Sequence, residues 1–355
     1  MTVAPAAPDG ARRGAPGGWP AGRSGSQAAW PAGRRPVGAP ARLRREPADL
    51  PPAGPAVETV WRAGWAVDVR RTLSPLVRGP GDPAHRFGPD GTFWRAALTP
   101  EGPATLALRI GAPGEVHATA WGPGASWTVA SVPDLLGVRD DPSTFAPRHP
   151  LLADVHRRHP GLRVPRTGLV LDALVPAILE QRVTGTQAHQ AWRFLLHKYG
   201  TPAPGPMPGL RVPPPPRTLL DVPTWDWHRA GVDLKRQRAL RAAATVAARL
   251  EECCGMAAAD ALGRLRVVPG IGVWTAAETA QRALGDADAV SVGDFHIPDL
   301  VGWALVGGPL DDDGMLEVLA EWPGHRHRVV LLVGLSRVGK PKRGPRFSPI
   351  DYRSM

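Results

Sequence analysis

The sequence predicts an α+β N-terminal domain followed by an all-α domain that contains a helix-hairpin-helix motif. Three observations lead to this fold class. Between residues 60 and 127, short apolar segments alternate with Pro/Gly turns, a pattern typical of antiparallel strands. After residue 136, apolar residues recur with the spacing of helices. Near residue 270, a turn with two glycines separates two of these helices.

The domain boundaries follow the same change of pattern. We expect a small α+β domain over residues 56–135 and a helical domain over residues 136–337. Residues 1–55 are rich in Pro, Ala, Gly and Arg without periodicity, so they bury too little apolar surface to fold. We expect a disordered tail there; a wrongly assigned start codon is the alternative. Residues 338–355 are expected to form a basic C-terminal tail.

The composition indicates a basic protein with room for two domains. The chain has 355 residues, with 43 Lys and Arg against 32 Asp and Glu, a formal net charge of +11. This balance suits a polyanionic partner such as DNA. The abundance of Arg beside Ala, Gly and Pro is also typical of a high-GC genome, so charge alone does not identify the partner.

Cysteine usage and hydropathy indicate a cytoplasmic protein. Cys253 and Cys254 are adjacent and cannot form an ordinary framework disulfide. Two cysteines are also too few for a four-Cys iron–sulfur cluster. The N-terminus has no apolar signal region, and the apolar run Val329–Leu335 is too short to span a bilayer.

Three segments of the N-terminal domain are predicted to be strands: Phe93–Leu98, Thr105–Ile110 and Glu115–Trp121. Their hydrophobic pattern shifts towards a period of two, and they are separated by Pro/Gly turns such as Gly88–Gly91 and Ala112–Gly114. An antiparallel sheet is the expected result.

The first core helix of the second domain is predicted from a stripe of apolar residues over Leu169–Leu179. Asp172 is the expected N-cap of this helix. Because Pro176 interrupts the pattern, we expect the regular helix to begin close to Val175.

Two more helices and a connection between them are predicted after this first core helix. A helix is expected through Trp192 to Tyr199, and Leu234–Leu250 predicts another, rich in Ala and Arg. Between them, Pro202–Pro216 is expected to be an extended connection without a helix of its own.

The helix-hairpin-helix motif is the most specific pattern in the chain. Helices predicted at Ala257–Leu265 and Val273–Leu284 leave only a tight turn between them. Gly270 and Gly272 can adopt a positive φ and lack a Cβ, so a DNA phosphate can approach the amides that open the second helix. Thr275 in its first turn is a further candidate DNA contact. The turn's carbonyls offer a place for a monovalent cation; no other cofactor is expected. An ordinary helix turn is the alternative.

After the second helix comes the loop Val290–Pro298, which contains Gly293-Asp294-Phe295-His296. Hairpin, helix and Gly-Asp-x-His loop in this order resemble the helix-hairpin-helix (HhH-GPD) DNA glycosylases, most closely the bacterial 3-methyladenine, AlkA-like branch. The resemblance covers about Val60–Leu335 and is strongest over Leu169–His296. It implies a monomeric, monofunctional N-glycosylase that flips alkylated purines out of double-stranded DNA and excises them in base excision repair.

The resemblance places the catalytic group at Asp294. Cleavage of the N-glycosidic bond builds positive charge on the sugar, and a carboxylate can stabilise that charge and orient the attacking water. A helix N-cap with no other role is the alternative. His296 is a candidate contact to a DNA phosphate or to the base pocket, with a structural histidine as the alternative.

Two residues of the second hairpin helix are candidates for the base pocket. Trp274 stands where bifunctional relatives have a Schiff-base lysine; an indole cannot form that bond, so a monofunctional enzyme is expected. Glu278 lies one turn further on the same face, where the 3-methyladenine enzymes carry an aromatic residue. A core tryptophan and a solvated glutamate are the alternatives.

The loop Gln181-Arg182 matches the one from which the family inserts a side chain into the duplex. Arg182 can fill the space left by an extruded base, and Gln181 can touch the partner strand or support the loop. An exposed arginine without a role is the alternative.

Two other functions remain open from the sequence: a non-catalytic helix-hairpin-helix DNA-binding protein, and a glycosylase for oxidised or deaminated bases.

Overall fold

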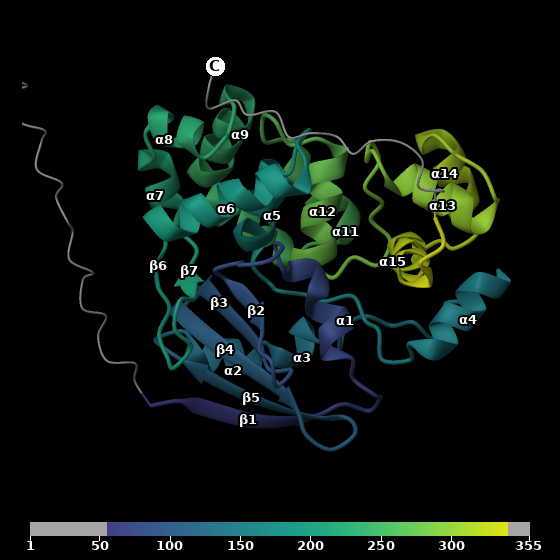
Figure 1. The fold of residues 1–355 in the computed structure, drawn as a ribbon, viewed down its shortest axis with the longest axis horizontal. Coiled ribbons are helices and arrows are strands. Elements are labelled where there is room, and N and C mark those ends of the chain that lie inside the picture. The colour runs from purple at the N-terminus through teal and green to yellow at the C-terminus, as the bar shows by residue number, and fades with distance from the viewer. Residues whose placement is uncertain (1–54, 340–355) are drawn as a thin grey trace, which may run out of the picture. The chain divides into compact units, whose positions relative to one another are not determined.

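The computed structural model describes residues 55–339 (Figure 1). The predictions of a disordered tail over residues 1–55 and of a basic tail over residues 338–355 fall almost entirely outside these residues, which include only residue 55 of the first and residues 338 and 339 of the second. No helix in the described part is long and apolar enough to cross a membrane.

The N-terminal part of the described chain forms an antiparallel five-stranded sheet in the order β1-β5-β4-β3-β2. The three predicted strands are confirmed, with ends shifted by a few residues at most; β1 and β2 were not predicted. The described strands of this sheet are β1 (Val57–Arg62), β2 (His85–Phe87), β3 (Phe93–Thr99), β4 (Gly102–Ile110) and β5 (Glu115–Trp121).

The sheet packs on both faces. Helix α2 (Ala125–Ala130) contacts strands β1, β4 and β5 and shares a core with the buried Phe93 and Leu108, which pair across β3 and β4. On the other face, Leu210 and Val212 pack against Ala96 of β3. These two residues belong to the proline-rich connection, which is extended as expected and forms the short ladder β6 (Thr201–Pro202) with β7 (Arg211–Val212).

Helices make up most of the rest. Those before the hairpin are α1 (Val69–Leu73), the 3₁₀ turn η1 (Ser74–Leu76), α3 (Val132–Leu135), α4 (Pro150–Arg158), α5 (Val170–Leu179), α6 (Gly185–Tyr199), α7 (Pro216–Asp221), α8 (Thr224–Arg229), α9 (Leu234–Thr245), α10 (Ala247–Glu251) and the 3₁₀ turn η2 (Glu252–Gly255). The hairpin helices and those after them are α11 (Ala258–Arg266), α12 (Val273–Ala283), α13 (Ile297–Leu305), α14 (Asp312–Leu319) and α15 (Arg326–Ser336).

Two details of α5 differ from the sequence prediction. The helix begins at Val170, so Asp172 lies inside its first turn and is not the N-cap. The Asp172 carboxylate instead accepts a hydrogen bond from Arg95 of β3 at 2.7 Å. Pro176 lies inside the helix and does not delay its start; the helix ends three residues later, at Leu179. The long-range ion pair is absent from any local pattern, which is why the cap was misassigned.

Helix α6 was predicted to follow Gly185 and to run through Trp192 to Tyr199; it includes Gly185 as its first residue and ends at Tyr199. Thr184 and Gln187 form a capping box that satisfies free amides at its start. The helix predicted over Leu234–Leu250 is divided at Val246, whose backbone leaves the helical region, into α9 and α10. Neither difference moves a candidate site residue.

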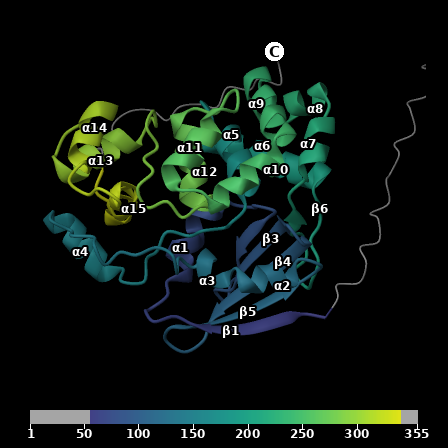
Figure 2. The same cartoon turned by 180° about the vertical axis from the view of Figure 1, so that it is seen from behind.

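The predicted hairpin helices are confirmed as α11 and α12. Helix α12 packs against α5, and residues from both lie in one hydrophobic core with α9. Helices α13, α14 and α15 form a neighbouring group with its own core around Met315 and Val329. Figures 1 and 2 show α11 and α12 between this group and helices α7–α9. The loop between α12 and α13 therefore lies where the two helical groups meet.

Candidate active site and DNA interface

The hairpin turn places its two glycines in different conformations. Gly270 has a φ of +88°, and a Cβ there would lie 2.7 Å from the Cβ of Ala239. Gly272 is the N-cap of α12, has an ordinary φ of −92°, and nothing lies within 4 Å of where its Cβ would be. The fold is therefore more stable with glycine at position 270 than with any residue that carries a Cβ. The chain itself gives no steric reason for glycine at position 272, and its exposed backbone leaves the α12 amides open to an approaching anion.

Gln181 joins the loop after α5 to the hairpin. Its side-chain amide donates to the carbonyl of Gly270 at 2.9 Å and to the hydroxyl of Thr275 at 2.8 Å. Thr275 is buried, and its hydroxyl faces Gln181. The structure thus joins three of the predicted DNA-binding residues, Gln181, Gly270 and Thr275, through two hydrogen bonds within the protein.

Arg182 extends this connection to the surface. It is exposed and has a φ of +53°, one of two non-glycine residues in the described chain with a positive φ. That conformation costs about 1–2 kcal/mol for an ordinary residue and persists only where neighbouring contacts impose it. Gln181 on one side and the capping box at Thr184 on the other fix the backbone around Arg182.

Asp294 lies in the loop before α13 and is half-buried. One carboxylate oxygen accepts hydrogen bonds from the backbone amides of His296 at 2.8 Å and Ile297 at 3.1 Å. The other accepts from the indole N–H of Trp274 at 2.9 Å. The N-cap of α13 is His296, so the N-cap alternative is not what the structure shows for Asp294. One oxygen of this carboxylate binds the backbone amides just before and at the start of α13, while the other is turned to α12. The predicted catalytic residue and the predicted pocket residue are in direct contact.

Next to Asp294, His296 is exposed, and its ring makes an edge contact with Phe295 at 5.0 Å between centroids. Phe295 is 78% exposed, the most exposed large aromatic residue of the described chain. The sequence analysis assigned no role to Phe295, because a single aromatic residue in a loop carries no pattern. Its exposure beside the hairpin adds an apolar group to the predicted DNA-facing surface.

Glu278 is 8% exposed, which excludes the solvated alternative. One carboxylate oxygen accepts from the Arg282 guanidinium at 2.7 Å and the other from the Ser291 hydroxyl at 2.5 Å. Burial raises the pKa of Glu278, but Arg282, Ser291 and Arg78 together outweigh burial and lower the pKa below its usual value. Glu278 is therefore a negative charge already neutralised inside the protein.

A second ion pair lies near this carboxylate. Arg78, which follows η1 and is 6% exposed, donates to Glu180 at 2.8 Å. Glu180 immediately precedes Gln181, and the positive charge of Arg78 also helps to lower the pKa of Glu278. Arg78 thus links the Gln181-Arg182 loop to α12 through electrostatic interactions. The sequence analysis missed Arg78, since 102 residues separate it from its partner.

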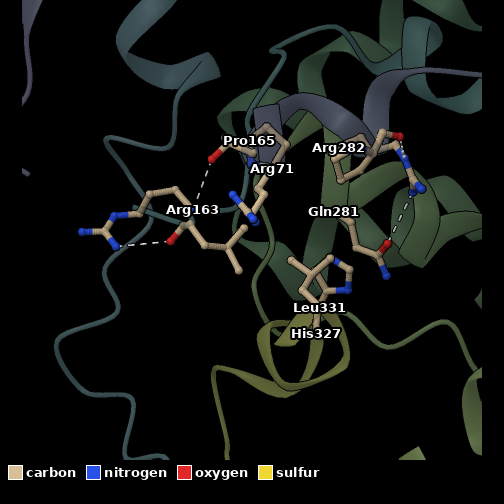
Figure 3. Close-up of a pocket in the computed structure, with 10 residues that line it drawn as sticks. Arg71, Arg163, Pro165, Gln281, Arg282, His327 and Leu331 are labelled. Carbon is tan, nitrogen blue, oxygen red and sulfur yellow. Dashed lines mark hydrogen bonds between the residues drawn. The ribbon is translucent and has the colours of Figure 1, made fainter. Parts of the chain in front are cut away.

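A small cavity of about 50 Å³ lies further along α12, two turns from Trp274 (Figure 3). Arg71, Gln281, Arg282 and His327 are among its lining residues. Figure 3 shows the guanidinium of Arg163 pointing away from His327. Burial, helped by Arg282 and opposed by Glu278, lowers the pKa of His327 to about 3, so the imidazole is neutral near pH 7. The sequence analysis gave this histidine no role.

No group of three or more His, Cys, Asp or Glu side chains within residues 55–339 is placed to hold a metal ion. Cys253 and Cys254 are both free. The hairpin carbonyl of Gly270 is already an acceptor for Gln181, and the monovalent cation predicted at the turn stays a prediction.

Comparison with known proteins gives a partial sequence match and a fold. No family model matches the chain. A Mycobacterium tuberculosis protein described as a probable bifunctional transcriptional activator and DNA repair enzyme AlkA is 32% identical over 150 residues. The match spans 42% of this chain but only 30% of that relative.

Solved structures match over most of the described chain. A 3-methyladenine DNA glycosylase from Archaeoglobus fulgidus has a TM-score of 0.65 and 16% identity, over 79% of this chain and 98% of its own. A Clostridium acetobutylicum 8-oxoguanine glycosylase/lyase has a TM-score of 0.61 and 11% identity, over 78% and 95%. The resemblance stated from the sequence is confirmed in two respects: the described chain has the fold of these DNA glycosylases, and its partial sequence match is to an AlkA protein.

Proposed function

We propose that the protein is a monofunctional DNA glycosylase that flips damaged bases out of double-stranded DNA and excises them, leaving an abasic site. Alkylated purines are the leading substrates. The contact between Asp294 and Trp274 carries this proposal. It puts a carboxylate at the N–H edge of an indole, just before α13 and close to a hairpin helix whose N-terminus is suited to a DNA phosphate.

Each residue of the site has a distinct task in this mechanism. The open amides at Gly272 bind a backbone phosphate and fix the register of the duplex. Arg182 enters the space left by the extruded nucleotide, which offsets part of the cost of unstacking. The base lies against Trp274, and the carboxylate of Asp294 stabilises the positive charge that develops on the sugar. A water molecule then completes the hydrolysis from the side that Asp294 faces.

The proposal of a monofunctional enzyme rests on position 274. A lyase reaction needs an amine that attacks the sugar and forms a Schiff base. Trp274 supplies an indole whose N–H is already bonded to Asp294. The abasic product should therefore remain uncut until alkali is added.

The preference for alkylated purines rests on the chemistry of Trp274. Alkylation at N3 or N7 makes a purine cationic, which weakens the glycosidic bond and strengthens stacking on an indole by roughly 0.5–2 kcal/mol. Because Arg282 already neutralises Glu278, the preference does not draw on that carboxylate. The solved relatives include a 3-methyladenine and an 8-oxoguanine enzyme, so a glycosylase for oxidised or deaminated bases is the second candidate.

A panel of duplexes with single defined lesions tests the proposal by the release of free base. We expect release of 3-methyladenine or 7-methylguanine to exceed release of uracil and 8-oxoguanine. Asp294→Asn should reduce release by orders of magnitude and change duplex affinity by only a few-fold. The matched control is Asp313→Asn, which alters an exposed aspartate in the first turn of α14. Normal turnover in Asp294→Asn would show that the protein binds DNA without the proposed chemistry.

A further inference from the structure

The loop that carries Asp294 is attached to α12 at two levels. The outer attachment is the hydrogen bond from the Trp274 indole to Asp294. The inner attachment is Ser291, which is 1% exposed; its hydroxyl donates to Glu278 and accepts from the side-chain amide of Gln281 at 2.9 Å. Residues 274, 278 and 281 are spaced i, i+4 and i+7, so one face of α12 makes all these contacts.

Ser291 is connected directly to the backbone of Asp294. The amide of Asp294 donates to the carbonyl of Ser291 at 3.2 Å, which closes a tight turn between the two residues. Because the Ser291 hydroxyl uses its one donor on Glu278 and accepts from Gln281, it has a single orientation. The position of the Ser291 side chain thus determines where the turn, and the carboxylate at its end, lies against α12.

Glu278 is itself held in place. Arg282 binds its second carboxylate oxygen, and the Arg282 side chain is anchored by donating to the carbonyl of Pro75 at 3.1 Å. A buried carboxylate with both oxygens occupied cannot turn to a new partner without leaving Arg282 or Ser291 unpaired, which is costly. These contacts and its 8% exposure turn both oxygens of Glu278 toward the protein rather than toward a bound base.

We propose that Glu278 is a positioning residue that acts through Ser291 to hold the Asp294 carboxylate in its working place, and that it does not contact the base. The inference rests on the proposed function, since it takes Asp294 to be the catalytic group. It changes the expected signature of a Glu278 variant. A residue that reads the base affects some substrates more than others, whereas a positioning residue affects all substrates by the same factor.

Single-turnover base release distinguishes the two roles. Ser291→Ala removes only the hydroxyl, and Glu278→Gln keeps an acceptor for Ser291 but loses the ion pair with Arg282. A small misplacement of a reacting group can cost on the order of 100-fold, so we expect each variant to lose roughly 10- to 100-fold. The loss should be equal on duplexes with cationic 7-methylguanine and with neutral hypoxanthine, at unchanged duplex affinity. The rate of base release by the double variant should be little lower than that of Glu278→Gln alone, because both changes disrupt the same contact between Glu278 and Ser291.

The matched control is Glu252→Gln, which removes a carboxylate paired with Arg264 at the protein surface; it should keep wild-type release. Wild-type release in Ser291→Ala would overturn the proposal. A Glu278→Gln loss confined to the cationic base would also overturn it, in favour of direct recognition. If Glu278→Gln melts well below the assay temperature, Ser291→Ala carries the test.

A measurement independent of activity separates failure of this inference from failure of the proposed function. Hydrogen exchange of the Trp274 indole N–H can be followed by NMR, with the signal assigned from Trp274→Phe. We expect exchange to be several-fold faster in Ser291→Ala and in Glu278→Gln, and unchanged in Glu252→Gln. If the wild type releases no base from any duplex, the proposed function fails while this test still applies. Unchanged exchange in both variants would refute the positioning role.

Discussion

Replacing the two hairpin glycines by alanine should separate folding from DNA binding. At position 270 the backbone has a φ of +88°, and the new Cβ would lie 2.7 Å from the Cβ of Ala239. The left-handed conformation costs about 1–2 kcal/mol, and relief of the overlap costs about 1–3 kcal/mol more. Loss of glycine's flexibility in the unfolded chain returns about 0.4–1 kcal/mol. The net loss for Gly270→Ala is therefore roughly 2–4 kcal/mol.

At position 272 the same substitution meets no atom within 4 Å and an ordinary φ of −92°. Alanine is a poorer N-cap than glycine, which lowers stability, but it makes the unfolded chain less flexible, which raises stability. The stability of Gly272→Ala should therefore stay within about 1 kcal/mol of the wild type. The added methyl group, however, projects from the exposed N-terminus of α12, where a phosphate has to approach. We therefore expect Gly272→Ala to fold normally and to bind duplex DNA more weakly.

Thermal melting and duplex affinity at several salt concentrations check both expectations. For a protein of this size, Gly270→Ala should melt several degrees below the wild type, at about 2–4 °C per kcal/mol. Gly272→Ala should lose affinity equally on different DNA sequences. If one phosphate contact is lost, the slope of log affinity against log salt concentration should become shallower by about 0.9. Wild-type affinity and salt slope in Gly272→Ala would refute the proposed phosphate site. Wild-type melting of Gly270→Ala would refute the described turn geometry.

Two further predictions follow from the structure. Arg182→Ala should slow base release by more than it weakens duplex affinity, because the lost side chain stabilises the complex in which the nucleotide is extruded. The effect should be smaller when the lesion is opposite an abasic site. An equal loss of affinity and rate would make Arg182 an ordinary phosphate contact. Burial raises the pKa of Asp82, but its interactions with His85 and with the amides of Arg78 and Ala84 prevail and lower it to about 2. Because this folded-state value is below the unfolded one of about 3.9, the carboxylate contributes about 2 kcal/mol above pH 4 that is lost as the pH falls toward 2. Denaturant unfolding at pH 7, 4 and 3 should show the advantage of the wild type over Asp82→Asn shrinking with acid, and a constant difference would contradict the assignment.

The local patterns of the sequence were enough to predict the central strands and both hairpin helices. Strand β2 was missed because three residues are too few to show a period of two, and its place in the sheet comes from pairing with β3. The contact of Trp274 with Asp294 could be expected in outline, since both residues belong to one motif. Not every partner of Glu278 could be predicted in this way. Arg282 lies one turn away on the same helix, but Arg78 is distant in the sequence and comes close to α12 only in the folded protein.

The hydrogen bonds from Gln181 to Gly270 and Thr275 join the Arg182 loop to the hairpin turn that we propose binds a phosphate, which restrains the two relative to each other. If Arg182 enters the duplex as proposed, the protein cannot bend its loop to fit an intact stack, so the DNA has to supply the deformation. The energy of bending and unstacking depends on the local sequence and is lowest at mismatched or damaged pairs. On this proposal, the protein would probe the deformability of the duplex before a base reaches Trp274. The first discrimination between damaged and intact DNA would then lie in the mechanics of the double helix, and the chemistry of the pocket would act second.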